Sequence, residues 1–151
     1  MNPRGAAQGV AVLVDTNVLS ELLRAQPDRA VLAWFAAQDQ GQLLVSAVTQ
    51  AEMLLGTLLL PRGKRRVLLQ QAVEALFRHD FADRVLAFDA LAAAAYAPVV
   101  AARRLAGRPI SQFDAQIAAI AASRRAAVAT RNTADFEGCG VTLHNPWNHV
   151  G

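Results

Sequence analysis

The chain opens with an unbroken apolar run, Val10–Val14, followed by three polar residues and then by apolar residues at helical spacing. The run is rich in β-branched valine, which is typical of a strand buried on both faces. The polar junction is Asp15-Thr16-Asn17. The apolar residues that share one helix face after it are Val18, Leu19, Leu22 and Leu23. The pattern predicts a strand ending at Asp15 and a helix starting directly after it.

Short apolar runs continue to alternate with helical stretches along the chain. Further strands are expected at 43–45, 85–88, 126–129 and 141–143, and further helices at about 28–39, 49–60, 64–78, 89–106 and from 111 onward. Such alternation predicts an α/β fold: a mainly parallel central sheet of four to five short strands, flanked by helices. No repeat or linker divides the chain. We therefore expect a disordered tail at Met1–Gly9 and a single domain over 10–151.

Composition narrows the class of protein. Hydrophobic residues make up 54% of the chain, but much of this excess is alanine, which favours helix over membrane span. Neither a transmembrane helix nor a signal peptide is evident, and the single cysteine, Cys139, excludes an internal disulfide, so we expect a cytoplasmic protein. The net charge of +3 comes from arginines, which permits a nucleic-acid partner without requiring one. The basic run 64–66 is either a phosphate-binding patch or a solvated helix face.

Four acidic residues lie close to predicted strand ends or helix starts. They are Asp15, Glu52, Asp114 and Asp135. A parallel sheet gathers the carboxyl ends of its strands at one edge, so these carboxylates are expected to converge there. Gathered carboxylates repel one another unless their pKa values rise or a cation neutralises them. An all-oxygen ligand set favours Mg²⁺ or Mn²⁺ over Zn²⁺, and Mg²⁺ held by acids usually serves phosphate chemistry.

Asp15 has a second interpretation, because an aspartate before a helix commonly caps it.

Other chemistries have weaker signals. The chain lacks a Gly-x-Gly-x-x-Gly and a Gly-x-x-x-x-Gly-Lys-Ser/Thr motif, and its histidines are scattered. A phosphatase with a nucleophilic Asp-x-Asp pair is disfavoured because Asn17 stands at the second position. Glu21 is either a surface residue or a partner contact.

Four segments resemble, in order, the motifs of PIN-domain toxins of the VapC and FitB type. They are Leu13–Leu22, Ser46–Gly56, Ser111–Ala118 and Ala129–Phe136. Each motif alone is weak, but four in the family's order span most of the chain. The closing segment Leu143–Trp147 is also similar to the family's last strand and tail.

This resemblance implies the toxin of a type II toxin–antitoxin system, a Mg²⁺- or Mn²⁺-dependent endonuclease that cleaves single-stranded RNA. The implied catalytic and metal-binding residues are Asp15, Glu52, Asp114 and Asp135. The implied supporting polar residues are Thr16, Asn17, Ser46, Thr130 and Asn132. Arg24 and Arg131 are the expected phosphate contacts.

The resemblance also implies a cognate antitoxin and a homodimer. Surplus apolar residues in 54–60 and 67–77 offer a surface for a symmetric contact. The alternative function is a non-catalytic PIN-like module that binds RNA or protein. Such a module has no need of a repulsive acidic cluster, so the four acids argue against it.

Overall fold

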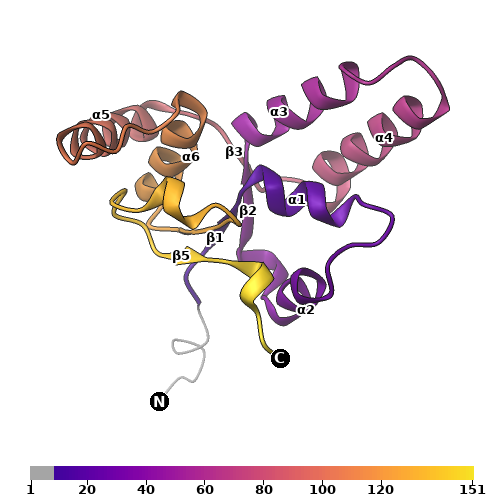
Figure 1. Cartoon of the computed structure of the whole chain (residues 1–151), viewed down its shortest axis with the longest axis horizontal. Helices are drawn as coiled ribbons and strands as arrows, with labels where there is room; N and C mark the ends of the chain where they lie inside the picture. The colour runs from indigo at the N-terminus through magenta and orange to yellow at the C-terminus, as the bar shows by residue number, and fades with distance from the viewer. Residues whose placement is uncertain (1–8) are drawn as a thin grey trace.

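The computed structural model describes residues 9–151 and shows one sheet with helices on both faces (Figure 1). The strands are β1 (Val12–Val14), β2 (Leu43–Ser46), β3 (Val85–Leu86), β4 (Ala127–Ala129) and β5 (Leu143–His144). Their order across the sheet is β3-β2-β1-β4-β5, and every neighbouring pair is parallel. The predicted α/β fold is confirmed. Apart from Gly9, the expected tail Met1–Gly9 lies outside the described residues.

In the described part of the chain, six α-helices connect or follow these strands. They are α1 (Thr16–Leu22), α2 (Arg29–Ala37), α3 (Ala47–Leu58), α4 (Lys64–Ala75), α5 (Ala90–Leu105) and α6 (Gln112–Ser123). Shorter turns are η2 (Gln40–Gln42), η3 (Leu76–Asp80), η4 (Thr133–Phe136) and η5 (Pro146–Asn148). Helix α3 begins two residues before the predicted start at Thr49, because the Ser46 hydroxyl accepts a hydrogen bond from the Thr49 amide and so caps the helix.

The strands at the centre of the sheet are buried on both faces, as the apolar runs predict. In β1, Val12 and Val14 pack into one hydrophobic cluster, whereas Leu13 packs into the other. Helices α5 and α6 lie on the Leu13 side, and α1 and α2 lie on the opposite side with α3 and α4 (Figure 1). The edge strands are shorter than predicted: β3 contains only Val85–Leu86, and β5 begins at Leu143.

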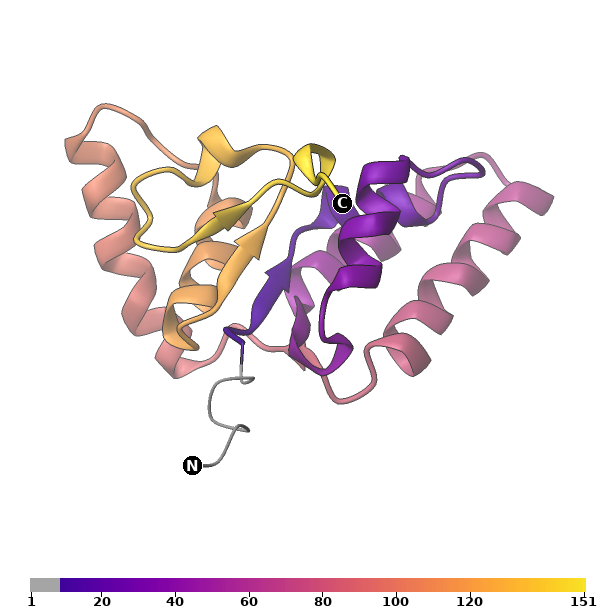
Figure 2. The same ribbon diagram turned by 90° about the horizontal axis from the view of Figure 1, so that it is seen from below.

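The C-terminal turn η5 returns to lie beside α2 (Figure 2). This return brings Trp147 back to the edge of the sheet where β1 ends and α1 begins. The sheet edge is therefore lined by segments from both ends of the described chain. Within residues 9–151, no helix is long and apolar enough to cross a lipid bilayer.

Candidate active site

Asp15 lies at the junction between β1 and α1, as predicted. Its amide donates to the carbonyl of Ala129 at 2.9 Å, which ties the junction to β4. One carboxylate oxygen accepts the Thr16 amide at 2.8 Å and caps α1, while the other accepts the Thr130 hydroxyl at 2.8 Å and the Asn17 amide at 3.3 Å. The side chain is only 5% exposed. Asp15 is therefore a helix cap and also a rigidly held carboxylate at the sheet edge.

Glu52 reaches the same edge from α3. Because α3 begins at Ala47, Glu52 lies in the second turn of the helix and not in the first turn as predicted. Its carboxylate accepts the Thr16 hydroxyl at 3.0 Å, and that hydroxyl also lies 3.0 Å from the hydroxyl of Thr49. Thr16 thus links the first residue of α1 to α3 and orients the Glu52 side chain.

Asp114 is the third residue of α6. The cap of this helix is Ser111, whose hydroxyl accepts the Asp114 amide at 3.2 Å. The carboxylate of Asp114 is half-buried and lies in the first turn, where the positive end of the helix dipole favours a negative charge. Capping of α6 is done by Ser111, so the Asp114 carboxylate is free for another role.

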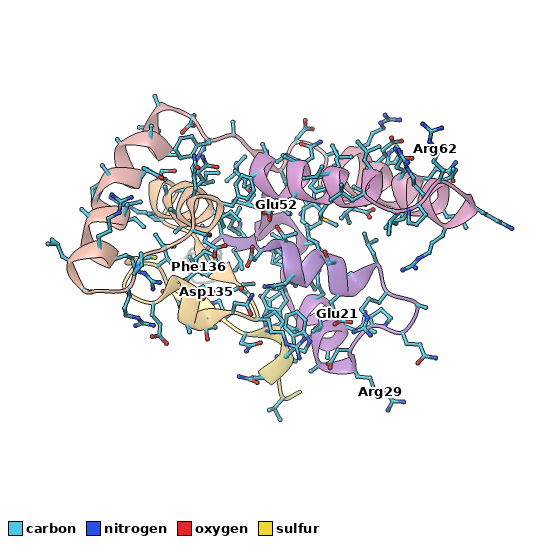
Figure 3. The ribbon with its side chains drawn as sticks, turned by 45° about the horizontal axis from the view of Figure 1, so that its top comes forward. Glu21, Arg29, Glu52, Arg62, Asp135 and Phe136 are labelled. Atoms are coloured by element: carbon cyan, nitrogen blue, oxygen red, sulfur yellow. The ribbon has the colours of Figure 1, made fainter. Side chains whose placement is uncertain are left out.

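These three carboxylates line one cavity of about 530 Å³ at the strand ends. The other lining residues are Thr16, Asn17, Ser20, Glu21, Arg24, Arg131, Asn132 and Trp147. Asp135 does not line this cavity. It is exposed in η4, beside buried Phe136 and away from Glu52 (Figure 3). The predicted convergence thus holds for three of the four acids, with Asp135 at the margin.

Burial and mutual repulsion disfavour the ionised forms of the three carboxylates. Burial raises the pKa of Asp15 from 3.8 to about 6, hydrogen bonds from Thr130 and Thr16 oppose this rise, and Asp114 and Glu52 add to it. Burial likewise raises the pKa of Glu52, with a further contribution from Asp114. Burial raises the pKa of Asp114, with a contribution from Asp135, while a hydrogen bond with Ser111 and the charge of Arg103 lower it. Asp15, Glu52 and Asp114 therefore lie within electrostatic reach of one another, and Asp135 lies within reach of Asp114.

The donors in the cavity suit a hard divalent cation. Its acidic residues supply only carboxylate oxygens, and no His or Cys lines it. A cation at this place would relieve the repulsion that raises the three pKa values. Among residues 9–151, however, no three Asp, Glu, His or Cys side chains are already arranged to hold one metal ion together. The site therefore suits a divalent cation in the type of its donor atoms and in the cavity that the three acids share.

Two arginines stand at the walls of the cavity. Arg24 is exposed and pairs with Glu21 at 3.2 Å, and the Glu21 carboxylate also accepts the Asp28 amide at 3.4 Å. Arg131 lies over the Trp147 ring at 4.9 Å from its centroid, and its amide donates to the Asn17 side chain at 3.2 Å. Both predicted phosphate contacts thus face the acidic cavity.

The supporting polar residues fall into two groups. Thr16, Asn17 and Asn132 line the cavity, and Thr130 is fully buried behind it, where its hydroxyl contacts Asp15. Ser46 is different: it is fully buried, caps α3 and does not line the cavity. Its hydroxyl lies 3.2 Å from the hydroxyl of Thr49, which in turn contacts Thr16 at the cavity wall, so Ser46 supports the site from behind and its role there stays a prediction.

Two features of the site were not predicted. Glu21 is buried, with 5% of its surface exposed, and it lines the cavity; its spacing from Val18 places both on one side of α1, which is the signal that could have found it. Trp147 lies in the C-terminal tail and lines the cavity, and nothing in its local sequence indicates that the tail returns there.

The basic run 64–66 begins α4, and Lys64 and Arg65 are exposed there, away from the acidic cavity. Arg65 lines a second groove of about 1040 Å³ between α1, α3 and α4. The run does not line the acidic cavity itself, but the groove that Arg65 lines shares Thr16, Arg24 and Glu52 with that cavity.

Comparison with known proteins gives consistent results. The PIN domain model matches residues 12–138. The chain is 44% identical over 136 residues to the VapC ribonuclease Y4jK of Sinorhizobium fredii, covering 90% of this chain and 97% of that protein. It is 39% identical to the toxin FitB of Neisseria gonorrhoeae, covering 91% and 99% respectively. The structure of FitAB bound to an IR36 DNA fragment superimposes with a TM-score of 0.86 at 39% identity, covering 93% of this chain and 98% of that chain.

Proposed function

The chain belongs to the PIN-domain family that includes the VapC and FitB toxins, and from this membership and the acidic cavity we propose that it is a metal-dependent endoribonuclease toxin. The observation that carries the proposal is the set of three carboxylates, Asp15, Glu52 and Asp114, that line one cavity with raised pKa values. We propose that they hold Mg²⁺ or Mn²⁺, with the more exposed Asp135 as a fourth contributor.

When bound, the cation would supply Lewis acidity for the scissile phosphate and lower the pKa of the attacking water. The protein's own groups would orient the reactants. Arg24 and Arg131 at the cavity walls are suited to bind the phosphates of single-stranded RNA, because guanidinium groups pair with phosphate through two parallel hydrogen bonds. One of the cavity acids, lying close to the attacking water, is suited to accept its proton.

We further propose a cognate antitoxin as the partner, acting with this chain in the cytoplasm. A groove between α1, α3 and α4 is suited to an apolar segment of such a partner. The apolar residues that line the groove include Leu23, Met53, Leu60, Leu68, Leu69 and Val73. The FitAB structure concerns a relative in complex with DNA, which agrees with a partner of this kind.

The toxin proposal is tested by expression in bacteria with and without the gene encoded beside it. Wild-type protein should arrest growth, and the neighbouring gene product should relieve the arrest. The Asp114→Asn variant should not arrest growth, whereas Glu74→Gln, an exposed acid on α4, should behave as wild type. Arrest by a folded Asp114→Asn protein would mean that toxicity is not nucleolytic, as expected of a non-catalytic PIN-like binding module.

The proposed homodimer has a smaller apolar surface than the sequence pattern predicts. Leu55, Leu58, Leu59, Val67 and Leu68 are exposed, but Val73, Leu76 and Phe77 are buried within the chain. We propose that the remaining exposed patch, at the end of α3 and the start of α4, forms the symmetric contact. Light scattering at micromolar concentration should give about twice the chain mass of 16.1 kDa, and a value near 16.1 kDa would contradict the dimer.

A further inference from the structure

Arg103 on α5 is a buried cation without a carboxylate partner. It is 5% exposed and is the only Lys or Arg side chain that is buried within residues 9–151. In this part of the chain no carboxylate lies within ion-pair distance of it. Burial of a charge is costly unless hydrogen bonds or an opposite charge compensate for it. The contacts of the guanidinium therefore indicate what the residue does.

The guanidinium of Arg103 donates to the backbone on both sides of Asp135. It contacts the carbonyl of Ala134 at 3.3 Å and also the carbonyl of Glu137. Arg108 adds an exposed second contact: it donates to the same Ala134 carbonyl at 3.2 Å and to the Glu137 carboxylate at 2.9 Å. Arg103 in the last turn of α5 and Arg108 in the loop after it thus hold the short segment that carries Asp135.

The segment has little support of its own. η4 contains only four residues, and short 3₁₀ turns have poor hydrogen-bond geometry. Phe136 anchors one side of the turn in the hydrophobic core, while the neighbouring Asp135 remains exposed (Figure 3). Directly after the turn, Gly138 has a φ of +78°, and a Cβ atom there would lie 3.8 Å from Cδ of Arg103. The chain therefore passes closely over the Arg103 side chain.

We propose that Arg103 is a positioning residue that holds the η4 backbone so that the Asp135 carboxylate stays beside Asp114. The inference rests on the proposed function, because it gives Asp135 its place among the metal-holding acids. Arg103 does not line the cavity; its guanidinium contacts the backbone of 134–137, and its positive charge also acts on Asp114 from a distance. Lysine would keep the positive charge but lose the planar fork that contacts two carbonyls together.

The test measures the affinity for Mn²⁺ by calorimetry, in a titration of the metal-free full-length protein with Mn²⁺. Arg103→Lys should weaken Mn²⁺ binding about tenfold, as is usual when a residue that orients a metal ligand is changed. Arg104→Lys, an exposed arginine one position along α5, is the matched control and should bind as wild type. In an Asp135→Asn background, Arg103→Lys should cause no further loss, because both changes remove the same carboxylate contribution.

An equal loss with and without Asp135 would overturn the inference, since it would mean that Arg103 supports the fold generally. Wild-type-like binding by Arg103→Lys would overturn it also. If Arg103→Lys does not fold by circular dichroism, Arg108→Ala takes its place: that exposed variant should show a smaller loss that again disappears with Asp135→Asn. Failure of the proposed function has a different signature, because wild-type protein would then bind no Mn²⁺, and Arg103 would have no metal site to support.

Discussion

Asp15 and Asp135 both follow a parallel strand, yet they are held in opposite ways. Asp15 is buried, and both of its carboxylate oxygens accept hydrogen bonds from Thr16, Asn17 and Thr130. Asp135 is exposed, and its carboxylate accepts no hydrogen bond from residues 9–151; only its backbone is held, through the carbonyls on either side. The difference teaches that a carboxylate directly at a strand end is held differently from one that follows its strand through a loop and a short turn. Hydrogen bonds to its own carboxylate hold the Asp15 side chain in place, whereas the position of Asp135 depends on the contacts of its backbone.

The largest expected effect separates these two residues in RNA cleavage. Asp15→Asn should lower the rate at least about a thousandfold, equivalent to about 4 kcal/mol of transition-state stabilisation, and excess Mg²⁺ should not restore it. Asp135→Asn should lower the rate about 10- to 100-fold and recover partly at high Mg²⁺, because it lies at the edge of the site. Cleavage of a single-stranded RNA pool over a range of Mg²⁺ concentrations measures both. If both variants lost the same activity and recovered it equally at high Mg²⁺, the distinction between Asp15 and Asp135 would not hold.

The next effect concerns the stability of the metal-free protein. The native pKa of Asp15 is raised from 3.8 to about 6, so the native state binds this proton more tightly than the unfolded state does. The contribution of Asp15 to the free energy of unfolding should therefore decrease as the pH rises from about 4 to about 6. The full penalty, on the order of 3 kcal/mol, applies above that range.

Thermal melts in EDTA at pH 5 and pH 7.5 measure this penalty. Wild-type protein should lose more stability between the two pH values than Asp15→Asn, which carries no titrating group at that position. Asp39→Asn, a change at an exposed cap of η2, should follow the wild-type pH dependence. A wild-type profile parallel to that of Asp15→Asn would show that burial does not perturb this carboxylate. Mg²⁺ should stabilise wild-type protein more at pH 7.5, because it binds the ionised form.

The smallest expected effect is that of Asp114→Asn on thermal stability. In EDTA this variant should melt at or above the wild-type temperature, because it removes a repulsive charge while Ser111 still caps α6. Mg²⁺ at a hundredfold excess over Kd should stabilise wild-type protein by roughly 2.7 kcal/mol, and the variant by less. Four melts, two proteins with and without Mg²⁺, measure both quantities. A variant much less stable in EDTA would indicate that the Asp114 carboxylate supports the fold.

The fold and most of the acidic site follow from local patterns in the sequence. The valine run before Asp15 and the Ser111 cap before Asp114 are signals carried by a few adjacent residues, and both are found where they were predicted. The errors arise where two local signals compete. Ser46 and Thr49 are both suitable caps, and in the structure the Ser46 hydroxyl accepts the Thr49 amide, so the helix begins at Ala47.

The rest of the site depends on contacts between segments far apart in the chain. Arg103 shares a buried helix face with Ala92 and Val99, at a spacing that the sequence shows, but its partners in 134–137 are brought to it by tertiary structure. Asp135 was grouped with the other acids because it follows β4. Its position at the edge of the cavity is set by η4, whose short length gives no clear local pattern.

The most direct test is the metal dependence of RNA cleavage by the wild-type protein. Purified protein is incubated with single-stranded RNA at pH 7.5 in EDTA, then with Mg²⁺ in excess over the chelator, and then with further EDTA. We expect no cleavage in the first stage, cleavage in the second, and an immediate stop in the third. Cleavage that proceeds in EDTA at the rate seen with Mg²⁺ would contradict the assignment of the acidic cavity as a metal-dependent nuclease site.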